Sequence, residues 1–248
     1  MIRSQTARKG FVAHVIMTTI ASNLQAVRNA IAAAAAGAGR VPDDIVLLAV
    51  SKTFPPKAIR EAYHAGQAAF GESYVQEALG KIAALHDLPI EWHFIGPIQS
   101  NKTRAIAENF AWAHSVDRLK IAERLSAQRP QNLPPLNVCL QVNVSGEGSK
   151  SGVAPDEVAG LAQAVAQLPQ LRLRGLMAIP APEEGLTAQR KPFAKLRELM
   201  QCLNAYGMTL GTLSMGMSHD LEAAVLEGAT IVRVGTAVFG ERNYGENK

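Results

Sequence analysis

The chain has 248 residues, of which 48% are hydrophobic and 5% aromatic, enough apolar material for one large domain or two small ones. The formal net charge is +4, and basic residues do not form a stripe interleaved with aromatic residues, so nothing favours a nucleic-acid-binding protein. No stretch is long and apolar enough to span a membrane. Cys139 and Cys202 stand far apart without metal-ligand spacing. We therefore expect reduced thiols in a cytoplasmic protein, and no metal site.

The start of the chain is poor in acidic residues, the first of which is Asp43. A start that contains Arg and Ser but no acid can mark an organelle transit peptide. Residues 1–16, however, show no convincing amphipathic helix. We therefore interpret them as a mobile N-terminal extension, and we expect residues 17–248 to form a single domain because no linker rich in Pro, Gly or Ser divides them.

Apolar residues recur every three or four positions over residues 18–36, which predicts a helix that Gly37 and Gly39 end. From residue 45 onward, strand-like and helix-like segments alternate. The predicted strands span residues 45–51, 68–71, 91–96, 111–115, 136–144, 172–179, 211–215 and 230–235. The predicted helices between them span residues 56–64, 74–85, 101–108, 117–128, 155–168, 191–206 and 219–226.

Eight strands that alternate with helices predict a closed (β/α)8 TIM barrel with one extra N-terminal helix, since each unit takes roughly 27 residues. Such alternation indicates parallel pairing through right-handed crossovers. The competing fold, an open doubly wound sheet, usually has a Gly-rich turn after its first strand. Here the first strand is followed by the residues SKTFPP (51–56) instead.

Lys52 stands at the carboxyl end of the first predicted strand, where barrels of this type place their active sites. Desolvation disfavours a charged amine at the mouth of a buried strand. A neutral amine there is a nucleophile suited to a Schiff base with an aldehyde. On this strand alone, a lysine that points to water is the more ordinary interpretation, and the rest of the chain reverses that preference.

The turns after the seventh and eighth predicted strands have the composition of a phosphate site. The seventh strand runs into SMGMS (214–218), with a helix expected to begin near Ser218, and the eighth runs into Gly235 and Thr236. Hydroxyls, small residues and backbone N–H groups offer a phosphate several donors and room for close approach. Either turn alone could be a helix cap, but these are the two loops that often bind phosphate in barrels.

Arg233 lies within the eighth predicted strand, on the same side as Ile231 and Gly235. If that side faces the barrel interior, its guanidinium is a buried cation that must pair with a core carboxylate or face a polar ligand atom. The sequence leaves both alternatives open. His93, between Trp92 and Phe94, is interpreted as a hydrogen-bonded core histidine rather than a metal ligand.

In combination, these motifs resemble the pyridoxal phosphate homeostasis protein family, which is similar to the barrel domain of alanine racemase. The similarity runs from about residue 20 to residue 244. The motifs are AVSKT (49–53), FGE (70–72), WHFIGPIQSNK (92–102), SKSG (149–152), GLM (175–177), SMGMS (214–218) and VRVGT (232–236).

The resemblance implies a barrel of the alanine racemase N-terminal type that binds pyridoxal 5′-phosphate. Lys52 would carry the Schiff base, and Arg233 would face the pyridine nitrogen. The cofactor-binding set also includes Ser214, Met215, Ser218, Gly235 and Thr236. Of these, Ser218, Gly235 and Thr236 would hold the phosphate. One departure stands out, because the family usually has Asn after FGE and this chain has the shorter Ser73.

The resemblance also implies a cytoplasmic monomer that buffers pyridoxal phosphate or delivers it to apo forms of enzymes that use it. An arginine at the pyridine nitrogen cannot readily donate a proton, so the ring is a weaker electron sink. The chain also ends soon after its eighth strand, so we expect no second domain to bring the additional acid/base of a racemase. We therefore favour a carrier over an enzyme, with an amino-acid racemase and a Schiff-base aldolase as alternatives.

Overall fold

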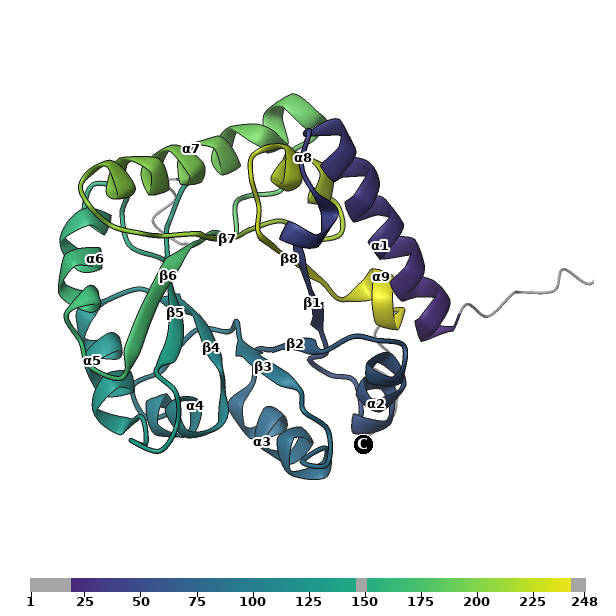
Figure 1. The fold of residues 1–248 in the computed structure, drawn as a ribbon, viewed down its shortest axis with the longest axis horizontal. Coiled ribbons are helices and arrows are strands. Elements are labelled where there is room, and N and C mark those ends of the chain that lie inside the picture. The colour runs from purple at the N-terminus through teal and green to yellow at the C-terminus, as the bar shows by residue number, and fades with distance from the viewer. Residues whose placement is uncertain (1–18, 146–150, 242–248) are drawn as a thin grey trace, which may run out of the picture.

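A computed structural model of the chain describes residues 19–145 and 151–241. The predicted N-terminal extension and the first two residues of the SKSG motif lie outside the described residues. Eight parallel strands follow one another around a closed barrel, and β8 pairs with β1. Figure 1 shows the helices as a ring around these strands. The fold is a (β/α)8 barrel, which confirms the prediction from the alternating pattern.

The strands are short and follow the order of the chain. They span Val46–Val50 (β1), Ala69–Glu72 (β2), Glu91–Phe94 (β3), Trp112–Val116 (β4), Leu136–Gln141 (β5), Leu171–Met177 (β6), Thr212–Ser214 (β7) and Ile231–Val234 (β8). The α-helices span Ile20–Gly37 (α1), Pro56–His64 (α2), Val75–Ala84 (α3), Thr103–Asn109 (α4), Leu119–Gln128 (α5), Val158–Ala166 (α6), Leu186–Ala205 (α7), Leu221–Leu226 (α8) and Thr236–Phe239 (α9). A short 3₁₀ helix, Pro42–Asp44, precedes β1.

The structure differs from the sequence-based boundaries mainly at helix starts. Helix α7 begins at Leu186 and carries Pro192 in its interior. The sequence-based start, residue 191, would put this proline in the first turn, where proline is ordinary. Helix α8 begins at Leu221 rather than near residue 218. The short helix α9 was not predicted, since four residues are too few to show a helical period.

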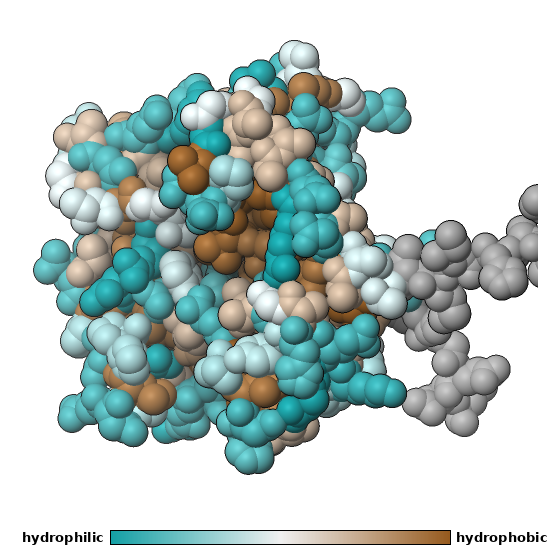
Figure 2. Space-filling model, turned by 45° about the vertical axis from the view of Figure 1, so that its right-hand side comes forward, coloured by the Kyte–Doolittle hydropathy of each residue, from teal (hydrophilic) through white to brown (hydrophobic). Residues whose placement is uncertain are grey.

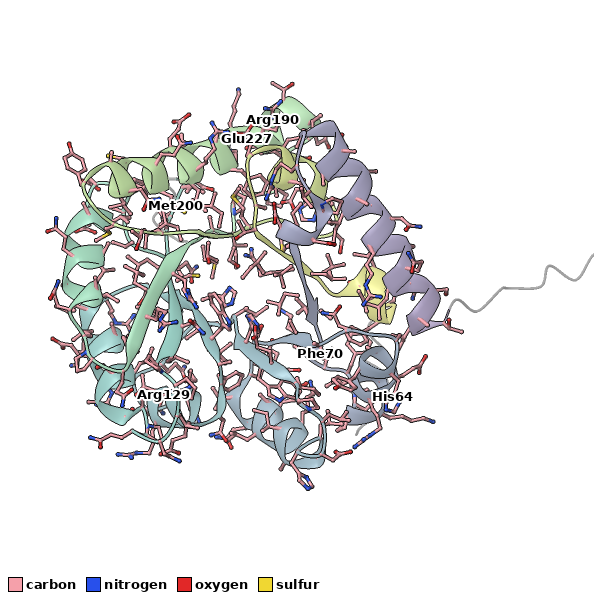
Figure 3. The ribbon with its side chains drawn as sticks, viewed as in Figure 1. His64, Phe70, Arg129, Arg190, Met200 and Glu227 are labelled. Carbon is pink, nitrogen blue, oxygen red and sulfur yellow. The ribbon has the colours of Figure 1, made fainter. Side chains whose placement is uncertain are left out.

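The main hydrophobic core lies between the strands and the surrounding helices. Phe70 of β2 is one of its fully buried side chains, and Figure 3 labels it. A second, small cluster joins Leu48, Ala69 and Ile231. These residues come from strands alone, so we place this cluster inside the barrel. Barrel interiors are usually filled by branched apolar residues, but here buried polar side chains, including His114, share the space.

Ion pairs to a buried glutamate join helices α7 and α8. Glu227, just after α8, accepts hydrogen bonds from Arg190 and Arg197 of α7, with 2.6 Å between Arg190 Nε and Glu227 Oε1. Figure 3 shows Arg190 and Glu227 together where α7 meets α8. Helix α1 packs beside α8 and α9, and Asn23 Nδ2 donates to the Val238 carbonyl at 3.0 Å. The N-terminal helix thus supports the segment that follows β8.

The outer surface is largely hydrophilic in the view of Figure 2, with hydrophobic residues gathered in a hollow near the middle of that face. Among the helices of the described residues, none has the length and apolar character needed to cross a membrane.

The two cysteines are expected to differ sharply in reactivity. Cys139 of β5 is fully buried, and burial raises the pKa of its thiol to about 12, while Cys202 of α7 is exposed. Because the thiolate is the reactive form, a disulfide reagent such as Ellman's reagent should titrate one thiol in the folded protein and two after denaturation. The variant Cys202→Ser should show none until it unfolds. Two reactive thiols in the folded protein would contradict this assignment.

Candidate functional site

A cavity of about 270 Å³ lies at the carboxyl ends of the strands. It is lined by Val50, Lys52, Ser73, Ile95, Ile179, Met217, Ser218, His219, Arg233, Gly235 and Thr236. Five of the predicted cofactor-binding residues therefore share one cavity, although 184 positions separate Lys52 from Thr236. The loops after β1, β7 and β8 bring them together, as the carboxyl ends of parallel strands do in this fold.

Ser214 and Met215, also predicted as binding residues, do not line this cavity. Ser214 is fully buried, and both its hydroxyl and its carbonyl accept hydrogen bonds from Arg233. The Met215 side chain packs in the hydrophobic core, and its N–H donates to the Ile231 carbonyl at 3.1 Å. Ser214 therefore supports a residue of the cavity, while Met215 supports the sheet.

Lys52 occupies the second position of a tight turn. The Phe54 N–H donates to the Ser51 carbonyl at 3.0 Å, which closes the turn. Thr53, in the third position, has φ of +71°, a left-handed conformation that is unusual for a β-branched residue and typical of the third residue of a type II turn. Phe54 stacks on Phe239 of α9, with ring centroids 4.9 Å apart. The turn that presents Lys52 is thus held in a strained shape.

A buried lysine holds this turn in place. Lys81 of α3 is almost fully buried, and its Nζ donates to the Ser51 carbonyl at 2.7 Å and to Glu72 Oε1 at 2.8 Å. Its third contact is Glu77 Oε1, at 2.5 Å. An ammonium group has three N–H donors, so all of them have acceptors. The same Glu77 oxygen accepts the Thr53 N–H at 2.6 Å. Both neighbours of Lys52 are therefore tied to one charge network.

Glu72 carries the buried negative charge of this network. Its Oε1 also accepts the Ser51 hydroxyl at 2.6 Å. Among the described residues, its Oε2 is a buried side-chain oxygen without a hydrogen-bond partner. Burial raises the pKa of Glu72, and the charge of Lys81 offsets part of that rise. The glutamate of the FGE motif therefore serves the Lys52 turn rather than the cavity itself.

Arg233 is 4% exposed, and its contacts with Ser214 and Ala178 show that its side of the strand faces the barrel interior. Its Nη1 donates to the Ser214 carbonyl at 2.6 Å and to the Ser214 hydroxyl at 2.8 Å, and its Nη2 donates to the Ala178 carbonyl at 2.9 Å. Burial lowers the pKa of Arg233 to about 10, with Asp220 acting in the opposite direction. Of the two alternatives that the sequence left open, these contacts favour the polar ligand atom. Within the described residues, neutral oxygens hold the cation.

The turn after β7 requires a glycine. Gly216 has φ of +91°, and a Cβ there would lie 2.5 Å from the Cβ of Ala224. Its carbonyl accepts the Arg233 N–H at 3.0 Å, so the turn is joined to β8. In addition, Asp220 Oδ1 accepts the Met217 N–H at 2.5 Å. These contacts bring Ser218 to the same cavity as Gly235 and Thr236.

Ser73, the residue that departs from the family pattern, lies in the cavity wall. Its carbonyl packs against Gly96, where a Cβ would come within 2.2 Å of that oxygen. The backbone of Ser73 is therefore packed tightly against Gly96. Because Ser73 lines the cavity, a change of side chain at this position changes the cavity lining.

Sequence reasoning missed the residues that support the cavity from outside. Lys81 sits in a helix with an ordinary amphipathic pattern, and its spacing from Glu77 predicts only a surface i, i+4 pair. Its burial depends on Glu72 of β2, which a helical pattern cannot reveal. His114 likewise gave no signal, because its partners are on other strands.

Comparison with known proteins places the chain in a family. Residues 17–243 match the family model described as alanine racemase, N-terminal domain. The pyridoxal phosphate homeostasis protein of Pseudomonas aeruginosa is 66% identical over 229 residues, which are 92% of this chain and 98% of that protein. The chain belongs to the pyridoxal phosphate homeostasis protein family. The resemblance drawn from the motifs is thereby confirmed.

Further members of the pyridoxal phosphate homeostasis protein family support this assignment. The protein of that name from Escherichia coli K12 is 54% identical over 233 residues, which are 93% of this chain and 100% of that protein. Among solved structures, PipY of Synechococcus elongatus with pyridoxal phosphate bound has a TM-score of 0.78 and 40% identity. The match covers 90% of this chain and all of PipY.

Proposed function

We propose that the chain binds pyridoxal 5′-phosphate in the cavity at the carboxyl ends of the strands and holds it for later release, with Lys52 as the attachment point. The observation that carries this proposal is that Lys52, Arg233 and the two hydroxyl- and glycine-containing turns line one cavity. At about 270 Å³, this cavity is near the small end of ligand pockets, a size that suits a single substituted pyridine ring with a phosphate arm.

The residues of the cavity match three polar parts of the cofactor, which are its aldehyde, its phosphate and its ring nitrogen. When bound, pyridoxal phosphate supplies an aldehyde that condenses with amines and a ring that withdraws electrons. Lys52 provides the amine. We assign Ser218, Gly235 and Thr236 to the phosphate and Arg233 to the ring nitrogen. PipY with its bound pyridoxal phosphate supports this cofactor for a chain of the same fold and family.

A holding role fits the chemistry of Arg233 better than strong catalysis does. Although burial lowers its pKa to about 10, the guanidinium keeps its proton at neutral pH. It can donate a hydrogen bond to a ring nitrogen, but it does not transfer a proton to it. We therefore propose buffering or delivery of the cofactor to apo enzymes by a cytoplasmic monomer.

The attachment point can be tested by trapping. The purified protein, loaded with pyridoxal phosphate and reduced with borohydride, should carry the cofactor's mass on the peptide that contains Lys52. Lys52→Ala should lose both that mass and the visible absorbance of the loaded protein. Lys57→Ala is the matched control, since Lys57 is an exposed lysine of the neighbouring helix α2. Full loading of Lys52→Ala would contradict the proposal.

A second measurement separates holding from catalysis. The loaded protein, incubated with alanine or serine in heavy water, should exchange the amino-acid α-proton slowly or not at all. Fast exchange that disappears in Lys52→Ala would instead identify a racemase-type enzyme.

A further inference from the structure

A chain of hydrogen bonds crosses the barrel interior and ends at Arg233. Glu91 Oε1 lies 2.7 Å from His93 Nε2, and His93 Nδ1 lies 2.9 Å from His114 Nε2. His114 Nδ1 lies 2.8 Å from the Ser214 hydroxyl, which accepts from Arg233 Nη1 at 2.8 Å. The chain joins strands β3, β4, β7 and β8. It leads from the amino end of β3 to the cavity at the opposite end of the barrel.

Burial isolates the middle of this chain from water. His93 is 1% exposed and His114 is fully buried, whereas the Glu91 side chain is about half exposed at 51%. Burial lowers the pKa of His93, and Glu91 offsets part of that shift. Burial also holds the pKa of His114 well below its usual value, with further lowering from His93 and Arg233. Both imidazoles are therefore neutral at pH 7, and each has one N–H donor and one acceptor nitrogen.

The charged ends then determine the direction of every bond. The hydrogen bond from His93 lowers the pKa of Glu91, so this carboxylate is ionised and only accepts. His93 must therefore carry its proton on Nε2, which leaves Nδ1 as an acceptor for the Nε2–H of His114. His114 Nδ1 is then an acceptor for the Ser214 hydroxyl, and the oxygen of that hydroxyl receives the Arg233 N–H. The direction runs from cation to anion without a break.

The bond from Arg233 to the Ser214 hydroxyl affects the cavity, because Arg233 lines it. Among the described residues, Arg233 uses three of the five N–H groups of its guanidinium on Ser214 and Ala178, so two remain for a ligand in the cavity that it lines. Two of those three bonds go to Ser214. A serine hydroxyl can rotate, and it presents a lone pair to Arg233 only when its proton is directed elsewhere. His114 Nδ1 accepts the hydrogen bond that this hydroxyl donates.

We propose that His114 and His93 are positioning residues that orient the Ser214 hydroxyl and, through it, fix Arg233 as a hydrogen-bond donor to the ring nitrogen of the ligand. This inference rests on the proposed function, because it takes pyridoxal phosphate as the ligand that Arg233 meets. The relay defined by Glu91, His93, His114 and Ser214 acts on Arg233 from outside the cavity. None of these four residues lines the cavity itself.

The predicted tautomers of His93 and His114 can be tested without a ligand. In protein labelled with ¹⁵N-histidine at pH 7, two-bond ¹⁵N–¹H correlation spectra should show His93 and His114 as neutral rings protonated at Nε2. The variant His64→Phe, which changes an exposed histidine of α2, helps to assign the signals. Protonation of His114 at Nδ1, or a positively charged ring at either position, would overturn the relay.

A ligand comparison tests the effect on Arg233. Binding is measured for pyridoxal phosphate and for its benzene analogue, in which C–H replaces the ring nitrogen and leaves no acceptor for Arg233. Ser214→Ala and His114→Phe should each weaken binding of pyridoxal phosphate about 10-fold, as expected for a lost charge-assisted hydrogen bond, and leave the analogue unchanged. His114→Asn, whose side-chain oxygen can take the serine proton, should restore part of the loss. His64→Phe should alter neither ligand.

The outcomes separate this inference from the proposed function. Failure of the wild-type protein to attach pyridoxal phosphate at Lys52 would reject the proposed function. Normal attachment, together with equal losses for both ligands in Ser214→Ala and His114→Phe, would reject the positioning role and leave the proposed function intact. Equal affinity of the wild-type protein for the two ligands would also overturn the inference. Circular dichroism of each variant establishes whether the barrel has folded. If His114→Phe does not fold, the smaller change Ser214→Ala tests the positioning role by itself.

Discussion

Replacing Glu72 with alanine is expected to lower the free energy of unfolding by about 3–5 kcal/mol, the usual cost of removing one partner from a buried ion pair. Glu72 is fully buried, and its partner Lys81 is nearly so. The alanine variant leaves the Lys81 ammonium in the interior with the Ser51 carbonyl and Glu77 as its remaining partners. The reverse change, Lys81→Met, leaves the buried Glu72 carboxylate with the Ser51 hydroxyl as its one side-chain donor among the described residues.

The double variant Glu72→Leu with Lys81→Met should recover most of the lost stability, because an apolar pair of similar size needs no desolvation of charge. Unfolding by urea, followed by circular dichroism, gives the free energy of unfolding of each variant. Arg60→Ala is the control: it breaks an ion pair with Asp87 whose side chains are 37% and 48% exposed, and such pairs contribute about 0–1 kcal/mol. A loss for Glu72→Ala no larger than that for Arg60→Ala would contradict the buried network.

The same network explains how Lys52 can stand in a strained turn. A residue such as Thr53 in the left-handed region costs about 1–3 kcal/mol, and its N–H is held by Glu77. Ser51 is held on the other side by Lys81 and Glu72. Strain of this kind persists only where surrounding contacts determine the backbone. The ion pairs of Lys81 therefore help to hold the turn that carries Lys52.

The barrel could be predicted from the sequence because the alternation of strand and helix patterns is local, and each period is visible within a few residues. The position of Lys52 followed from the same pattern, since it comes directly after an apolar run. Alternation placed Arg233 on one side of its strand with Ile231 and Gly235, and the structure shows that this side is the interior one.

The supporting residues could not be predicted, because their environment arises only when the barrel closes. His114 and Ser214 are 100 positions apart and meet across the interior. The helical pattern around Lys81 predicts a surface residue, because its partner Glu72 comes from the separate strand β2. The place of Met215 in a motif predicted a binding residue. The structure adds that its N–H donates to the Ile231 carbonyl and that its side chain packs in the core.

Gly175→Ala is the second change from which we expect a large effect. Gly175 lies in β6, opposite Thr212 of β7. A Cβ at this position would lie 1.8 Å from the Thr212 carbonyl oxygen and 2.7 Å from its carbon. Backbone atoms cannot rotate away as the end of a side chain can, so the two strands must separate. Overpacking in a core usually costs about 1–3 kcal/mol, and this clash with a strand should reach the upper end of that range or exceed it.

Thermal unfolding should show the change clearly, because about 3 kcal/mol corresponds to a fall in Tm of roughly 6–12 °C for a chain of this size. Gly160→Ala is the matched control: Gly160 lies within α6, where nothing stands within 4 Å of the added Cβ. Alanine is favoured over glycine in a helix by about 0.5–1 kcal/mol, so this variant should be slightly more stable. An unchanged Tm in Gly175→Ala would show that β6 and β7 can separate without cost. Because β7 ends at Ser214, which holds Arg233, that separation should also weaken binding of pyridoxal phosphate, whereas Gly160→Ala should leave it unaltered.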